Sequence, residues 1–147
     1  MFAQSRYATF LVVLMITVTV WPMRAGAIDV SDADRSTFRT IISGQIDAFR
    51  RDDGAAAFAY ASPMIRSIFR TPDAFVEMVR RGYMPVYRPR RVDFGPVTDE
   101  LGAPTQRVDV VGPDGSLWTA LYAMERQPDG TWRISSVVLI RSTGESV

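Results

Sequence analysis

Apolar residues between positions 31 and 51 have the spacing of one long helix. They recur every three or four residues, so they share one helical face that is predicted to be buried. Ser31 followed by Asp34 predicts the helix start, because the hydroxyl can cap the first turn and the carboxylate lies near its positive end. The run Asp52-Asp53-Gly54 predicts its end. The apolar stripe consists of Phe38, Ile41, Ile42, Ile46 and Phe49.

Three shorter helices are predicted after this one. Residues 54–61 are rich in alanine and suit a short helix. Ser62-Pro63 and Thr71-Pro72 each place a capping side chain before a proline at the first helical position, where the missing N–H removes no hydrogen bond. The helix that starts at Pro72 is expected to end at Gly82, and its predicted buried residues are Phe75, Val76 and Val79.

Beyond residue 82 the chain changes to β-branched and aromatic runs separated by turns rich in glycine, proline and aspartate. Four strands are predicted, at residues 90–94, 105–111, 117–126 and 131–141. Short connections make consecutive strands antiparallel neighbours. Helices that precede an antiparallel sheet define an α+β fold, with the long helix and the short helices packed on a four-stranded sheet.

Strand periodicity predicts which residues face the helices, because alternate side chains share one side of a sheet. In the third strand these are Trp118, Ala120, Tyr122 and Met124. In the fourth strand they are Trp132, Ile134, Ser136, Val138 and Ile140. Both sets are mostly apolar, as a buried face requires.

The first 27 residues have the pattern of a secretory signal peptide. Arg6 precedes an uncharged run from residue 7 to residue 23, and the small residues Ala25-Gly26-Ala27 follow. We expect cleavage after Ala27, which leaves residues 28–147 as a single periplasmic or secreted domain. The alternative is an uncleaved anchor, but Pro22 and Arg24 end the apolar run early, so no stable membrane span is expected after cleavage.

The absence of three residue types narrows the chemistry. The chain has no histidine, cysteine or lysine, which excludes disulfides, thiolate nucleophiles, imidazole bases, Schiff bases and the usual zinc ligands. We therefore expect no cofactor and no metal. The mature part would carry 15 arginines and 16 acidic residues, since two of the 17 basic residues precede position 28, and this balance argues against nucleic-acid binding.

Residues 58–95 and 118–140 resemble a bacterial family described as domain of unknown function 4864. The residues that carry the resemblance are Ala61-Ser62-Pro63, Phe75-Val76-Glu77-Met78-Val79, Gly82-Tyr83, Pro85-Val86-Tyr87-Arg88-Pro89 and Asp129-Gly130-Thr131-Trp132-Arg133-Ile134. The family is similar to the nuclear-transport-factor-two-like, or cystatin-like, architecture. The resemblance thus implies a cone in which helices cover a curved antiparallel sheet, and it implies no activity.

The segment from residue 80 to residue 91 is the first candidate site. It holds Arg80, Arg81, Arg88, Arg90 and Arg91, interleaved with tyrosines and prolines. Arginine binds carboxylates, phosphates and sulfates through paired N–H groups, so this segment is predicted to bind an anionic ligand or an anionic component of the envelope. The alternative is that these side chains favour the negative end of a helix and solvate an exposed loop.

Gln45 is the second candidate, because it shares the apolar stripe of the long helix. A polar side chain in that position needs a partner. The functional prediction places it in a cone-shaped pocket with Tyr60, Trp118 or Tyr122, where it binds a small apolar ligand that carries one polar group. The alternative is that Gln45 lies at the edge of the stripe and bonds the backbone, while the aromatic residues pack in the core.

Asp93 and Asp109 raise a catalytic hypothesis, since a buried carboxylate beside a tyrosine can transfer protons, as a lyase or an isomerase requires. Alternation instead places them on a solvent-exposed charged face together with Arg91 and Arg107. We therefore predict a noncatalytic binding or assembly module of the bacterial envelope. A homodimer is a further expectation, because an open antiparallel sheet leaves one face to cover.

Overall fold

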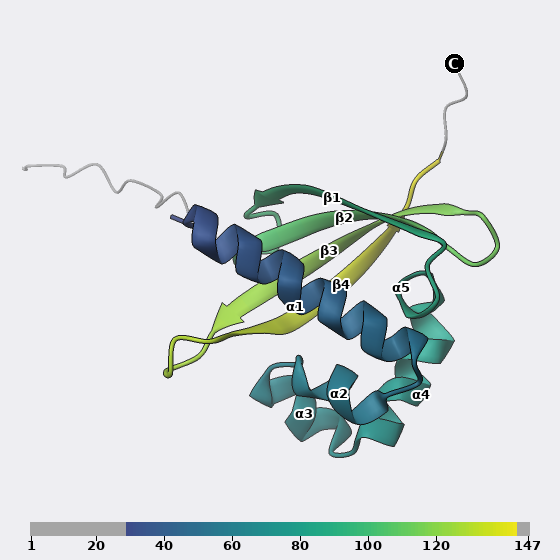
Figure 1. Ribbon diagram of the computed structural model, residues 1–147, viewed down its shortest axis with the longest axis horizontal. Coiled ribbons are helices and arrows are strands. Elements are labelled where there is room, and N and C mark those ends of the chain that lie inside the picture. The colour runs from purple at the N-terminus through teal and green to yellow at the C-terminus, as the bar shows by residue number, and fades with distance from the viewer. Residues whose placement is uncertain (1–28, 144–147) are drawn as a thin grey trace, which may run out of the picture.

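The computed structural model describes residues 29–143, which form helices followed by one antiparallel sheet (Figure 1). The strands follow each other in the order β1-β2-β3-β4. The predicted α+β fold class is therefore confirmed. The helices are α1 (Asp32–Arg50), α2 (Gly54–Ala59), α3 (Pro63–Phe69), α4 (Pro72–Gly82) and α5 (Met84–Tyr87), and the strands are β1 (Arg91–Thr98), β2 (Thr105–Val111), β3 (Leu117–Arg126) and β4 (Trp132–Arg141).

The predicted helix starts are confirmed by their capping hydrogen bonds. The Ser31 hydroxyl accepts from the Asp34 N–H at 3.1 Å, and the Ser31 N–H donates to the Asp34 carboxylate at 3.3 Å, which is a capping box. Ser62 and Thr71 accept from the backbone N–H groups of Ile65 and Ala74. Local sequence thus determines where these helices begin.

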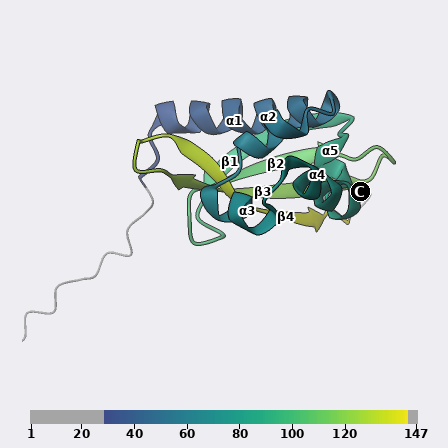
Figure 2. The same ribbon diagram turned by 90° about the horizontal axis from the view of Figure 1, so that it is seen from below.

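Two apolar clusters hold the fold together. Helix α1 covers the inner face of the sheet (Figure 2), and the larger cluster joins these two layers. Helices α2, α3 and α4 lie beside β4 (Figure 1) and share a second cluster with the end of α1. The larger cluster includes Phe38, Ile42, Ile46, Val86, Val108, Val110, Ala120, Tyr122, Met124 and Ile134. The second includes Phe49, Phe58, Phe75, Val79 and Tyr87.

The predicted inner face of β4 is wrong beyond Ile134. Met124 pairs with Ile134 but Ala123 pairs with Ser136, so Ser135 is an extra residue and β4 contains a bulge. The bulge shifts the alternation by one residue. Val137 and Leu139 therefore pack on the core, whereas Val138 and Ile140 are 38% and 48% exposed.

Two further expectations between residues 82 and 98 need correction. β1 continues to Thr98 where a stop at residue 94 was predicted, because an irregularity at Gly95 and Pro96 bends the strand without ending it. The segment between α4 and β1, for which an exposed loop is one of the two expectations, contains the short helix α5, and Val86 and Tyr87 in it are buried. Aromatic burial outweighs the turn signals here.

Trp132 joins the start of β4 to the start of α1. Its indole N–H donates to the Asp34 carboxylate at 2.9 Å, and its ring meets Phe38 edge to face with centroids 4.8 Å apart. Among residues 29–143 no helix is both long and apolar enough to cross a membrane. The predicted signal peptide lies outside the described residues.

Candidate functional site

An apolar cavity of about 250 Å³ lies between α1, α3, α4 and β4. Aromatic and aliphatic side chains of three helices form most of its wall, and the strand contributes the residues around its bulge. In this region α4 packs mainly on α2, and α3 makes few contacts with α4. Its lining residues are Gln45, Phe49, Ala61, Ile65, Phe69, Phe75, Met78, Val79, Tyr83, Val86, Ile134, Ser135, Ser136 and Val137.

Gln45 is the predicted ligand residue that lines this cavity. Its side chain is buried, with 4% of the residue exposed. The amide Nε2 donates to the carbonyl of Ala57 at 3.2 Å and ties α1 to α2, while the amide oxygen accepts no hydrogen bond from residues 29–143. Gln45 therefore has both a structural bond and a free acceptor beside an apolar space.

The other three predicted ligand residues do not line this cavity. The Tyr60 hydroxyl lies against Gly44 of α1, where a β-carbon would clash with it. Tyr122 is fully buried in the core, and burial raises the pKa of its hydroxyl. Trp118 also lies on the inner face, where the Arg141 guanidinium is 5.7 Å from its ring. The predicted group of four is thus not one site.

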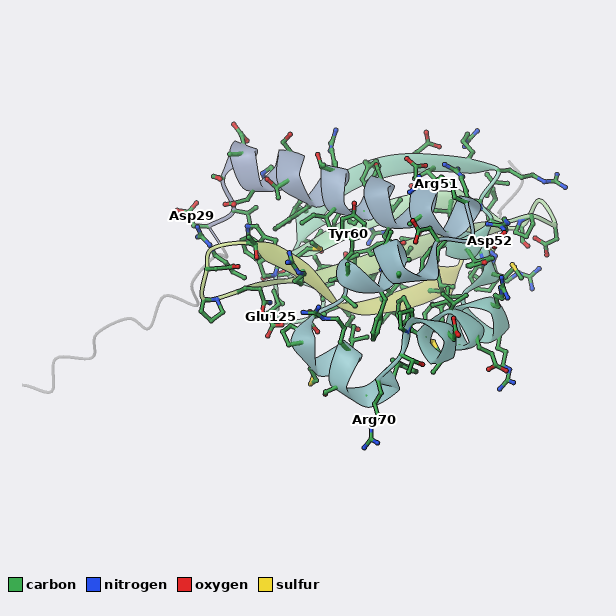
Figure 3. The ribbon with its side chains drawn as sticks, turned by 60° about the horizontal axis from the view of Figure 1, so that its bottom comes forward. Asp29, Arg51, Asp52, Tyr60, Arg70 and Glu125 are labelled. Carbon is green, nitrogen blue, oxygen red and sulfur yellow. The ribbon has the colours of Figure 1, made fainter. Side chains whose placement is uncertain are left out.

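Helix α3 forms one wall of the cavity through Ile65 and Phe69 but buries none of its residues fully. At its start the Ser62 N–H donates to the Ile134 carbonyl at 2.8 Å. At its end Arg70 has φ +65° and ψ −38°, and the Thr71 N–H donates to the Phe69 carbonyl at 2.7 Å, which is a strained γ-turn. Arg70 itself points into solvent (Figure 3).

Two of the five predicted anion-binding arginines hold the end of α1 instead. Asp52 accepts hydrogen bonds from the Tyr87 hydroxyl at 2.5 Å, from Arg88 at 2.7 Å and from Arg80 at 3.3 Å. Both guanidinium groups also lie over the Tyr87 ring, that of Arg80 5.2 Å and that of Arg88 4.6 Å from its centre. This Asp52 cluster joins α1 to α4 and α5.

Asp52 has φ +55°, a conformation that favours glycine. Its N–H donates to the Phe49 carbonyl and the Asp53 N–H donates to the Ala48 carbonyl, as in a Schellman motif. Bonds from Tyr87 and then Arg88 hold the pKa of the Asp52 carboxyl below its usual value. The carboxylate explains why a residue other than glycine occupies this position.

The remaining arginines of the segment are dispersed. Arg81 bonds Glu77 of its own helix, Arg91 bonds Asp93 at 2.7 Å, and Arg90 forms no ion pair within the described residues. Four of the five guanidinium groups thus already form ion pairs with carboxylates of the chain. Anion binding by this segment stays a prediction that the structure does not favour.

Asp93 and Asp109 lie opposite each other in the β1–β2 register, on the outer face of the sheet. Both are exposed, and Asp109 accepts from the Thr119 hydroxyl at 2.8 Å. The inner cavity and Tyr122 lie on the opposite side of the strands. The two carboxylates therefore do not converge with a buried tyrosine, as a proton-transfer site in the cone would require.

Sequence reasoning missed the residues that make up most of the cavity wall. Ile65, Phe69, Met78 and Val137 read as ordinary packing residues, because apolar spacing does not distinguish a filled interior from a hollow one. One signal was available: α3 carries Met64 and Ile68, which are 62% and 64% exposed, as well as its inner apolar pair. A short helix that is apolar on several sides has no single buried face.

Comparison with known proteins gives one match. The family model described as Domain of unknown function (DUF4864) matches residues 31–147. No curated protein and no solved structure matches the chain. The wider likeness to the nuclear-transport-factor-two-like architecture stays a prediction.

Proposed function

Because the chain belongs to the DUF4864 family, which carries no assigned activity, we propose from the geometry that it is a noncatalytic binding module. It holds a small apolar group in the cavity between α1, α3, α4 and β4. The observation that supports this most is an apolar space of about 250 Å³ with Gln45 among its lining residues. The signal-peptide pattern of residues 1–27 supports placing this module in the periplasm or outside the cell.

The size and lining of the cavity support an apolar ligand with one polar atom. Ligand sites in proteins are mostly apolar, with a few polar groups that fix orientation, and start at about 300 Å³. This cavity is slightly smaller, so it suits a compact ligand or a single large side chain. The free oxygen of Gln45 would accept a hydrogen bond from it.

The same lining argues against the lyase or isomerase alternative. No aspartate or glutamate is among its lining residues, and general acid–base chemistry needs a titratable group within hydrogen-bond reach of the reacting atom. Tyr83 is the one titratable residue among those that line it. Binding without turnover is the function that this set of side chains supports.

We test the proposal with 1-naphthol, a bicyclic ligand with one hydroxyl, and with naphthalene, which lacks it. Met78→Trp should fill the cavity and abolish binding of both, whereas Met84→Trp, which lies outside the lining, should not. Gln45→Leu should weaken 1-naphthol by about fivefold, the worth of one hydrogen bond, and leave naphthalene unchanged. Calorimetric titration measures the affinity of the wild type and the three variants for both ligands. Equal affinity of the wild type and Met78→Trp would contradict the proposal.

A further inference from the structure

The outer edge of β4 is covered over its first part and open over the rest. Residues 60–62 run beside Ile134 as a parallel bridge. The Ile134 N–H donates to the Tyr60 carbonyl at 2.9 Å, and the Ile134 carbonyl accepts from the Ser62 N–H at 2.8 Å. The chain then turns away into α3, so this cover ends at the bulge.

The bonding pattern shows which groups of β4 face the open edge. The Ser142 N–H donates to the Leu117 carbonyl at 2.9 Å, and antiparallel pairs alternate between bonded and non-bonded. Ser136, Val138 and Ile140 therefore bond β3. Val137, Leu139 and Arg141 direct their N–H and C=O groups outward, where none has a backbone partner within residues 29–143.

The cavity borders the start of this free edge. Ser135, Ser136 and Val137 line it from β4, while Ile65 and Phe69 of α3 and Met78 of α4 line it from the helices. Figure 1 shows α3 and α4 beside β4 and not across the sheet. A row of unpaired backbone groups and an apolar space for one side chain thus occur at the same place.

We propose that an extended apolar peptide segment adds as a further strand to β4 beyond Ser136 and places one large apolar side chain in the cavity. This inference rests on the proposed function and names its ligand class. A peptide backbone is what satisfies alternating N–H and C=O groups along an edge, while a pocket beside the edge selects the side chain. A compact small molecule would leave the edge unpaired.

A second copy of the chain fits this edge less well. Symmetric pairing of two β4 strands centred on Leu139 would place Arg141 of the second copy opposite Val137. A guanidinium would then lie at the mouth of an apolar cavity, where its desolvation is unfavourable. A separate peptide with an apolar residue at that position avoids this cost.

The test uses proline, which removes an N–H but is tolerated where that N–H faces outward. Leu139→Pro removes a donor of the free edge and no bond to β3, and Leu139→Ala is its matched control because it shortens the side chain but keeps the N–H. The probe is a fluorescein-labelled peptide that alternates threonine with valine around a central phenylalanine. A second peptide has alanine in place of the phenylalanine.

We expect Leu139→Pro to weaken the phenylalanine peptide by about fivefold relative to Leu139→Ala, and 1-naphthol affinity to be the same in both. The wild type should bind the alanine peptide more weakly. On peptide addition, the amides of Val137, Leu139 and Arg141 in the wild type should gain protection from hydrogen exchange, a measurement that does not depend on the folding of the proline variant.

Four results would overturn the inference. Equal peptide affinity of the proline and alanine variants, with no gain in amide protection, rules out edge pairing. If 1-naphthol binds and the peptide does not, the proposed function stands but its ligand is not a peptide. If neither binds, both the proposed function and this inference are wrong. A wild-type dimer that Leu139→Pro converts to a monomer, measured by light scattering, identifies a second copy as the occupant.

Discussion

Asp52 shows how one residue can combine backbone strain with a structural role. Its positive φ disfavours any residue with a β-carbon, yet its carboxylate accepts hydrogen bonds from Tyr87, Arg88 and Arg80. Glycine would relieve the backbone and lose all three bonds. Two of the five arginines that suggested an anion site in the sequence thus bind a carboxylate of the chain itself.

The pKa of Asp52 predicts how stability depends on pH. The folded pKa is lowered by Tyr87 and then Arg88 from an ordinary value of 3.8, so the unfolded chain binds the proton more readily. The stabilisation is complete above the unfolded pKa and is lost as pH falls through the folded pKa. In urea unfolding from about pH 6 to about pH 2, the free energy of unfolding should fall less steeply for Asp52→Asn than for the wild type. Identical slopes would contradict the role of this carboxylate.

Two buried tyrosines should respond in opposite ways to loss of the hydroxyl. The Tyr122 hydroxyl has no hydrogen-bond partner among the described residues, so Tyr122→Phe should raise the free energy of unfolding by about 1 kcal/mol. The Tyr87 hydroxyl donates to Asp52, so Tyr87→Phe should lower it by about 1 kcal/mol. Urea titration at neutral pH measures both, and a destabilised Tyr122→Phe would reveal a partner for that hydroxyl.

At the scale of elements, α3 is the least buried helix of the cavity wall. It buries no residue fully and ends in the γ-turn at Arg70. Arg70→Gly should stabilise the protein by about 1 kcal/mol, because glycine adopts positive φ without strain. Arg66→Gly, in the regular part of the same helix, should destabilise it by about 1 kcal/mol. Equal effects on urea unfolding would mean that the turn is not strained.

Elements with local signals could be predicted from the sequence, and those set by tertiary packing could not. Ser31, Ser62 and Thr71 mark helix starts because their capping bonds lie within one turn. The bulge at Ser135 has no such local signal; it directly follows Ile134, which bridges Ala61. A strict period of two therefore assigned Val138 and Ile140 to the wrong face.

The candidate site could be predicted even less completely. Gln45 was identified because a polar residue in an apolar stripe is anomalous on its own. The cavity beside it arises from the relative positions of α3, α4 and β4, and no residue in its wall is unusual for its helix or strand. The three residues that were grouped with it, Tyr60, Trp118 and Tyr122, pack elsewhere.

At the scale of the whole molecule, the two sides of the sheet differ. Its inner face carries α1 and the core, while its outer face exposes Leu117, Val138 and Ile140 beside the charged residues of β1 and β2. A homodimer through this outer face stays a prediction. It would leave the open part of the β4 edge and the cavity free to bind another molecule.

The central claim is that the cavity between α1, α3, α4 and β4 is a binding site. The most direct measurement is the set of nuclear Overhauser effects between 1-naphthol protons and the methyl groups of the protein. The account predicts effects to Ile65, Val79, Ile134 and Val137, which line the cavity. Effects confined to Leu117, Val138 and Ile140 on the outer face would contradict it.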